Sequence, residues 1–109
     1  IMGTMHGPGY SGVLGLTKWN RQKFSIADDF HTYAIEWEKD QISWFFDGVR
    51  YSTYTRADLG DKKWVFDQPF FIILNLAVGG QLPGVVGLKT EFPAQLLVDY
   101  VRVYQRPEK

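Results

Sequence analysis

The sequence of 109 residues contains no cysteine, which excludes a disulfide framework and a thiolate metal site. Twelve basic and twelve acidic residues give a net charge of zero, so the chain has no electrostatic footprint for nucleic acid or an anionic membrane surface. Apolar stretches are short, and none approaches the roughly 20 residues that a membrane-spanning helix needs. These absences exclude nucleic acid and membranes as expected partners and indicate one small domain, or part of one.

Aromatic residues make up 17% of the chain, and short alternating runs are separated by glycine and proline. The clearest signal is Asp47-Gly48 between residues 42–46 and 49–54, because a type I′ hairpin turn needs positive φ at both central positions. Further elements are predicted as strands over residues 1–6, 30–37 and 95–104, a tight turn over 38–41 and a single helical turn within 56–63. The pattern predicts an all-β fold, an antiparallel β-sandwich.

Residues 70–78 form an apolar run that one amide, Asn75, interrupts and Gly79-Gly80 closes. We predict a central strand here, starting after Pro69 and covered on both faces. A buried amide without a partner costs about 1 to 3 kcal/mol, so the side chain of Asn75 is expected to bind either protein or a ligand.

The candidate chemical groups are few. Glu36 and Glu38 share a strand face at a spacing of roughly 7 Å, within the range of an inverting glycosidase, but their place beside a charged turn favours a solvated edge. His6 and His31 are too isolated for a zinc site. Asp99 stands alone in an apolar strand, where its charge would need a cation or several donors, and calcium would need further oxygen ligands.

Four blocks of sequence carry a family resemblance. They are HGPGYSG at residues 6–12, DDFHTYAIEW at 28–37, WVFDQPFFIILNLAVGG at 64–80, and FP at 92–93 with VDYVRVYQ at 98–105. Together they resemble the family 16 glycoside hydrolases of the laminarinase type, in the family's order and over nearly the whole chain. The resemblance implies a concanavalin-like jelly roll with a glucan cleft on its concave face. It also implies a secreted enzyme that cleaves β-1,3-glucan internally with retention.

The family's catalytic strand is not found in this sequence. Its two glutamates lie in a Glu-Ile-Asp-Ile-Met-Glu type motif, shortly before the strand that residues 1–6 match. The resemblance therefore implies the C-terminal half of such an enzyme, beginning within the fold as a partial sandwich. A retaining mechanism needs two carboxyl groups about 5 Å apart. We expect no catalytic residue in this chain, and no activity from the chain alone.

Other positions can be carried across from the family. His6 matches a histidine beside the catalytic strand that contacts the reacting sugar, although an ordinary strand histidine stays open. Asn75 matches an amide on the cleft floor, and Tyr33 is similar to a cleft-lining aromatic residue. Trp19 is either a sugar platform or a loop-packing residue. Asp99 corresponds to the side-chain ligand of a structural calcium site, whose other ligands are backbone oxygens from the N-terminal half.

Two functional classes follow from these residues. The first is half of a laminarinase that acts only when a partner supplies the catalytic strand, and the second is a module that binds β-glucan without cutting it. A third hypothesis is a purely structural, oligomeric sandwich. A jelly roll cut in two exposes an apolar face and an unpaired edge, so we expect a homodimer or higher oligomer.

Overall fold

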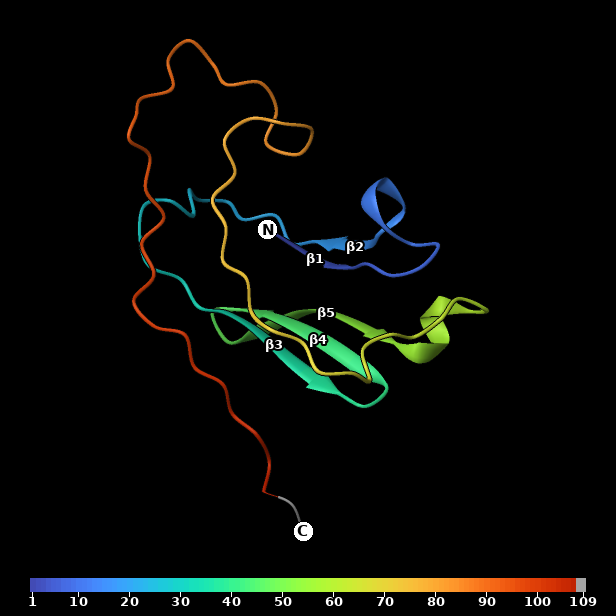
Figure 1. Ribbon diagram of the computed structural model, residues 1–109. Helices are drawn as coiled ribbons and strands as arrows, with labels where there is room; N and C mark the ends of the chain where they lie inside the picture. Colours follow the sequence, from blue (N-terminus) through green and yellow to red (C-terminus); the bar gives the residue numbers. More distant parts are fainter. Residues whose placement is uncertain (108–109) are drawn as a thin grey trace. The chain divides into compact units, whose positions relative to one another are not determined.

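The structure is a computed structural model that describes residues 1–107. It divides into two compact units, Ile1–Phe70 and the residues from Phe71 onward. The strands are β1 (Met2–Met5), β2 (Leu16–Trp19), β3 (Tyr33–Glu38), β4 (Gln41–Phe46) and β5 (Val49–Thr55), all in the first unit (Figure 1). Two short 3-10 helices, η1 (Gly12–Leu14) and η2 (Arg56–Leu59), complete the elements. Within the described residues, neither helix has the length or apolar character to cross a membrane.

Both sheets of the first unit are antiparallel. β1 and β2 form a two-stranded sheet, and β3, β4 and β5 form a three-stranded sheet in chain order (Figure 1). The predicted all-β, antiparallel partial sandwich is thereby confirmed. The predicted helical turn within residues 56–63 is present as η2, where the carboxylate of Asp58 accepts hydrogen bonds from the Thr55 N–H and hydroxyl.

The predicted hairpin is confirmed at its turn. Asp47 and Gly48 join β4 to β5 with φ angles of 48° and 76°, the positive values that a type I′ turn requires. β5 carries one irregularity: the register shifts between Trp44 and Phe45, which leaves Tyr51 as an extra residue on the β5 side.

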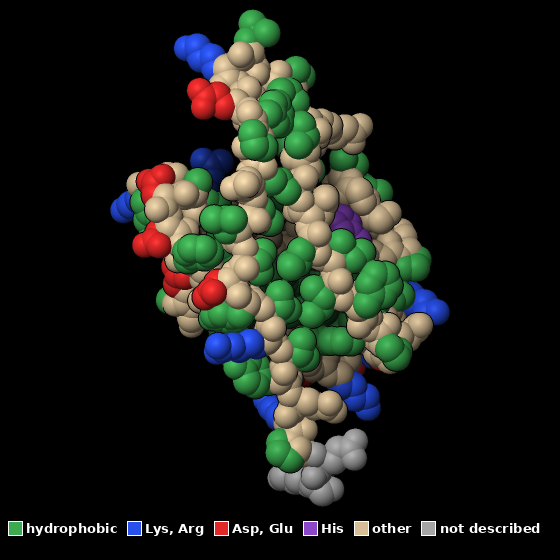
Figure 2. Space-filling view, turned by 60° about the vertical axis from the view of Figure 1, so that its left-hand side comes forward, with side chains coloured by type: hydrophobic (Ala, Val, Ile, Leu, Met, Phe, Trp, Pro, Cys, Tyr) green, Lys and Arg blue, Asp and Glu red, His purple; other side chains and the backbone are tan. Residues whose placement is uncertain are grey.

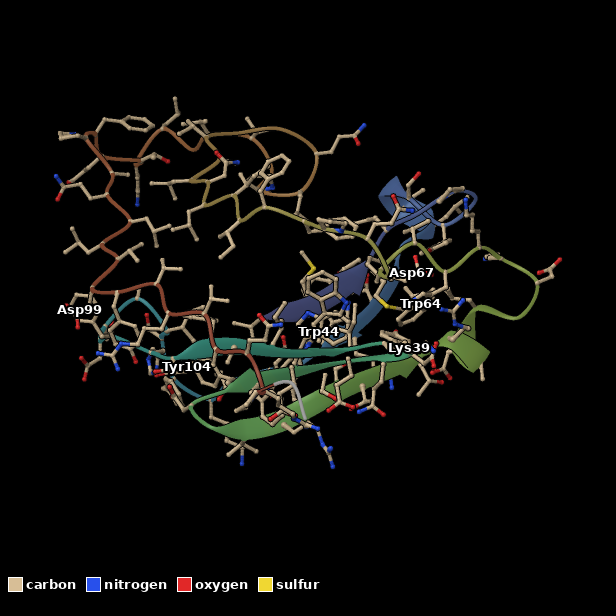
Figure 3. The ribbon with its side chains drawn as sticks, turned by 60° about the horizontal axis from the view of Figure 1, so that its bottom comes forward. Lys39, Trp44, Trp64, Asp67, Asp99 and Tyr104 are labelled. Atoms are coloured by element: carbon tan, nitrogen blue, oxygen red, sulfur yellow. The ribbon has the colours of Figure 1, made fainter. Side chains whose placement is uncertain are left out.

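The core of the first unit lies between the two sheets. Its buried members are Met5, Tyr10, Ile42, Tyr54, Leu59 and Trp64. The backbone of β1 approaches β4 closely, because a Cβ on Gly3 would lie 2.6 Å from Cγ of Trp44 (Figure 3). The phenol of Tyr10 donates a hydrogen bond of 2.8 Å to the carbonyl of Lys63, and burial raises the pKa of that phenol. These contacts fix β1 against the larger sheet.

The predictions for residues 70–78 and 95–104 are wrong for this structure. Neither segment belongs to a strand, and the apolar side chains of both are exposed; Ile73, for example, is 72% exposed. Figure 2 shows many hydrophobic side chains at the molecular surface. A strand needs neighbours that accept its N–H groups. The described residues supply none to these two segments, so their β-favouring composition is not realised as a sheet.

Candidate functional site

One face of the two-stranded sheet carries polar and aromatic side chains that point away from the core. The register pairs Thr4 of β1 with Thr17 of β2, and their hydroxyl oxygens lie 3.0 Å apart. His6 is two residues beyond Thr4 and Trp19 is two residues beyond Thr17, so strand alternation places all four side chains on the same side. We call this surface the outer β1–β2 face. It runs from an imidazole through two hydroxyls to an indole.

The imidazole of His6 rests on a glycine. A Cβ on Gly15 would lie 2.6 Å from Cε1 of His6 and 3.0 Å from Cγ2 of Thr4. The backbone of Gly15 therefore forms the floor beneath the ring, and a larger residue there would displace it. His6 remains exposed, so the ring is positioned by the protein yet open to a ligand.

Trp19 lies in strand β2, opposite Met2 of β1, with 65% of its surface exposed. An indole held by a strand and open to solvent offers a flat apolar surface with one N–H donor. This is the chemistry that a sugar ring can stack against. The assignment of Trp19 as a sugar platform stays a prediction.

Tyr33 lies on a different surface. Its strand partner is Phe46, and the two rings meet edge to face with centroids 5.4 Å apart. By alternation Tyr33, Ile35 and Trp37 share the core-side face of the three-stranded sheet, and all three are partly exposed there. Among residues 1–107, the ring contact of Tyr33 is with Phe46 of the three-stranded sheet, and its role in a cleft stays a prediction.

Asn75 and Asp99 both lie in the second unit and are both exposed. The expectation that Asn75 is a buried amide is therefore wrong here, because segment 70–78 is not covered. Around Asp99 (Figure 3), the described part of the chain contains no group of three or more metal-binding side chains. Since calcium takes six to eight oxygens, a site here would need backbone oxygens beside the Asp99 carboxylate, and the calcium site stays a prediction.

Glu36 and Glu38 lie on the exposed β3, and Glu36 is opposite Ser43 of β4. Their exposure agrees with the interpretation of a solvated edge. A pair of glutamates that performs acid and base chemistry needs an environment that separates their roles. Both of these side chains are exposed to solvent on β3.

Sequence reasoning missed a contact between His31 and the hairpin turn. Nδ1 of His31 lies 2.8 Å from Oδ2 of Asp47, and the imidazole is flanked by the rings of Phe24 and Phe46, with centroids 5.5 and 5.0 Å away. The N–H of Thr32 donates to Oδ1 of Asp47 and, with the bond from His31, holds the pKa of that carboxyl below its usual value. The two partners stand sixteen positions apart in the sequence, so no local pattern marks this contact.

Comparison with known proteins places the chain in a family. The model of the glycosyl hydrolases family 16 matches residues 1–101. The chain belongs to glycosyl hydrolase family 16. It is 44% identical to a beta-glucanase of Rhodothermus marinus over 112 aligned positions, which cover 96% of this chain and 39% of that protein. It is 39% identical to the glucan endo-1,3-beta-glucosidase A1 of Niallia circulans, covering 74% of this chain and 13% of that one.

Solved structures of the family show the same fold. The endo-beta-1,3-glucanase from Pyrococcus furiosus aligns with a TM-score of 0.78 and 44% identity, covering 84% of this family 16 chain and 37% of that structure. The catalytic domain of a laminarinase from Thermotoga petrophila aligns with a TM-score of 0.73 and 42% identity, with coverages of 84% and 38%. The resemblance to laminarinase-type family 16 proteins is thus confirmed. The chain spans less than two fifths of the length of these relatives.

Proposed function

We propose that this chain is the sugar-facing C-terminal portion of a retaining endo-β-1,3-glucanase, and that it does not cleave glucan alone because the two catalytic glutamates lie upstream of it. The observation that carries the proposal is the outer β1–β2 face, with His6, the Thr4–Thr17 pair and Trp19 aligned on one side. Similarity to endo-β-1,3-glucanases at 42 to 44% identity supports β-1,3-glucan as the ligand.

The chemistry of this face suits a neutral glucan. The indole of Trp19 can cover the C–H face of a glucose ring, while the threonine hydroxyls and the imidazole of His6 supply donors and acceptors for sugar hydroxyls. None of these groups carries a permanent charge. Affinity would thus come from stacking and directional hydrogen bonds, and it should depend little on salt.

Laminarin binding by the purified chain tests this face. We expect Trp19→Ala to weaken binding by about tenfold, the equivalent of one lost stacking contact. Phe30→Ala is the matched control, because Phe30 is 64% exposed and lies in the segment before β3, outside the face. Affinity electrophoresis in laminarin gels would measure both variants. Equal retardation of Trp19→Ala and Phe30→Ala would rule out the face as the glucan site.

Release of reducing sugar from laminarin tests the absence of catalysis. The sequence contains no Glu-x-Asp-x-x-Glu motif, so we expect no release from the chain alone. Addition of a polypeptide that contains the catalytic strand of a family 16 enzyme should restore release if the two parts assemble. Hydrolysis by the chain alone, abolished by Glu36→Gln or Glu38→Gln, would contradict the proposal.

The second candidate is a β-glucan-binding module without catalysis. It is favoured by a relative named beta-1,3-glucan-binding protein, from Penaeus monodon, which is 37% identical over 73 residues. Both candidates predict laminarin binding, and only the enzyme predicts hydrolysis after complementation. A structural oligomer would leave the outer β1–β2 face without a role.

Three further features belong to the proposal. The exposed apolar side chains of segment 70–78 favour self-association, so we infer a homodimer or higher oligomer. Secretion is inferred from the family, whose polymeric substrate lies outside the cell. A structural calcium ion at Asp99 is also part of the proposal, with backbone oxygens as its further ligands.

A further inference from the structure

A polar groove follows the outer edge of β5, which pairs with no other strand in the described part of the chain. Its volume is about 230 Å³ and its lining residues are Lys18, Arg50, Tyr51, Ser52 and Thr53. Two of the five side chains are cationic. Arg50 is exposed, and among the described residues it takes part in no ion pair. The groove therefore contains a guanidinium, that of Arg50, whose charge no carboxylate of the described residues neutralises.

The backbone N–H and C=O groups of Thr53 point outward from this edge, away from β4. The N–H of Arg56 donates to the carbonyl of Asp40 across the sheet at 2.9 Å, which sets the alternation of the β4–β5 ladder. Thr53, three residues earlier, is consequently in a non-hydrogen-bonded pair with Ser43, and its N–H and C=O point away from β4. The ammonium of Lys18 donates to that outward carbonyl at 3.1 Å. The Thr53 N–H faces the same way, and no acceptor from residues 1–107 is seen to pair with it.

The next outward position on the same edge already holds a carboxylate. The N–H of Thr55 donates to Oδ2 of Asp58 at 2.6 Å, and the Thr55 hydroxyl donates to the same oxygen at 2.9 Å. These bonds, together with the charge of Lys18, hold the pKa of Asp58 below its usual value. This edge of β5 therefore stabilises an anion at one position. Two residues away it presents a similar N–H, in a groove that Lys18 and Arg50 also line.

We propose that the groove at Thr53 binds the carboxylate or sulfate group of an acidic saccharide, held by the Thr53 N–H, the Arg50 guanidinium and the Lys18 ammonium. Charge-assisted bonds of this kind are about twice as strong as neutral ones. A peptide strand does not fit, because Lys18 occupies the Thr53 carbonyl that edge pairing would need. Nucleic acid does not fit either, because the chain's net charge is zero.

This site is separate from the proposed glucan face. Lys18 stands between Thr17 and Trp19 on β2, so its side chain leaves the opposite side of the strand. There it lies over the ring of Tyr54, 4.7 Å from the ring centroid. A ligand of the groove and a ligand of the outer β1–β2 face can thus bind at the same time, and one site can fail without the other.

Titration of the intact chain, followed by amide NMR, tests the proposal with three probes. Inorganic sulfate and a sulfated laminarin oligosaccharide should both give saturable shifts of the Thr53 amide signal, with tighter binding of the oligosaccharide. The unsulfated oligosaccharide should leave that signal in place while it perturbs β1 and β2. If the oligosaccharide binds no tighter than inorganic sulfate, the assignment to a saccharide is wrong.

Two charge variants complete the test. Arg50→Gln should weaken binding of the sulfated oligosaccharide by about tenfold, as expected for one charge-assisted contact. Lys62→Gln is the matched control, because it removes one exposed positive charge in the turn after η2. Equal losses in the two variants would show attraction to overall charge and overturn the site. Laminarin binding through Trp19 should be unchanged in both.

Discussion

Nδ1 of His31 lies 2.8 Å from Oδ2 of Asp47, across sixteen residues of chain. The same carboxylate accepts the N–H of Thr32, and the N–H of Asp47 donates to the carbonyl of Thr32 at 2.9 Å. The segment that enters β3 is thereby tied to the turn that leaves β4. One aspartate serves both the turn geometry and this connection.

This connection predicts a dependence of stability on pH. The bonds from the Thr32 N–H and His31 lower the pKa of Asp47 in the folded chain. A carboxyl with a lowered folded pKa contributes stability above its unfolded pKa, about 3.9, and that contribution is lost as pH falls through the folded pKa. Asp47→Asn should therefore show a shallower loss of stability below about pH 4 than the unchanged chain.

Urea unfolding at a series of pH values would measure this effect. Asparagine also accepts positive φ, so the turn is expected to survive the substitution. Asp61→Asn removes an aspartate that, in the described part of the structure, takes part in no ion pair, and it serves as the control. Parallel curves for Asp47→Asn and the unchanged chain would contradict the prediction.

Gly3→Ala should destabilise the first unit. The added Cβ would lie 2.6 Å from Cγ and 2.8 Å from Cδ1 of Trp44, so either β1 or the indole must move. Overpacking of this kind costs about 1 to 3 kcal/mol. Gly87→Ala meets its nearest atom at an ordinary 3.6 Å and is the control. Urea unfolding would measure both variants. An unchanged midpoint in Gly3→Ala, or an equal fall in the midpoints of Gly3→Ala and Gly87→Ala, would show that β1 is not packed on Trp44 as described.

Gly48→Ala should weaken the β4–β5 hairpin for a different reason. Nothing lies within 4 Å of a Cβ at Gly48, so the cost comes from its φ of 76° alone. Left-handed backbone costs an ordinary residue about 1 kcal/mol or more. Gly48→Asn should recover part of the loss, because asparagine tolerates this region. The prediction fails if alanine and asparagine give the same unfolding free energy.

Ile73→Lys should reduce self-association. The side chain of Ile73 is 72% exposed within an apolar segment, and a charge placed there opposes burial against a second copy. Light scattering over a range of protein concentrations should show a larger mean mass for the unchanged chain than for this variant. The exposed Val13, in η1 and 97% exposed, gives the control Val13→Lys. A monodisperse monomer of the unchanged chain would refute association.

Local chemistry explains which elements could be predicted. Asp47-Gly48 specifies the hairpin within two residues, and the structure has the turn there. β2 was not predicted, because Lys18 points toward the core side and interrupts the alternation that identifies a strand. The strands expected over 70–78 and 95–104 depend on distant neighbours, and composition alone could not show whether these are present.

In the candidate site, too, single residues could be predicted from the sequence, but their arrangement could not. His6 and Trp19 were individually named from the sequence, but their alignment on one face depends on the register of β1 with β2. Tyr33 and Asn75 were grouped with them by resemblance, whereas Tyr33 belongs to the three-stranded sheet and Asn75 to the second unit. The anion-binding edge was not foreseen, because it arises from backbone direction at Thr53 and no sequence motif marks it.

The hydroxyl contact between Thr4 and Thr17 has a consequence for both surfaces of β2. β1 and β2 are only four residues long each, so few bonds oppose sliding of one past the other. A slip by a single position would turn the indole inward and the ammonium outward. The hydroxyl contact between the two threonines thus favours the one register in which the neutral and the cationic side chains lie on opposite faces of this two-stranded sheet.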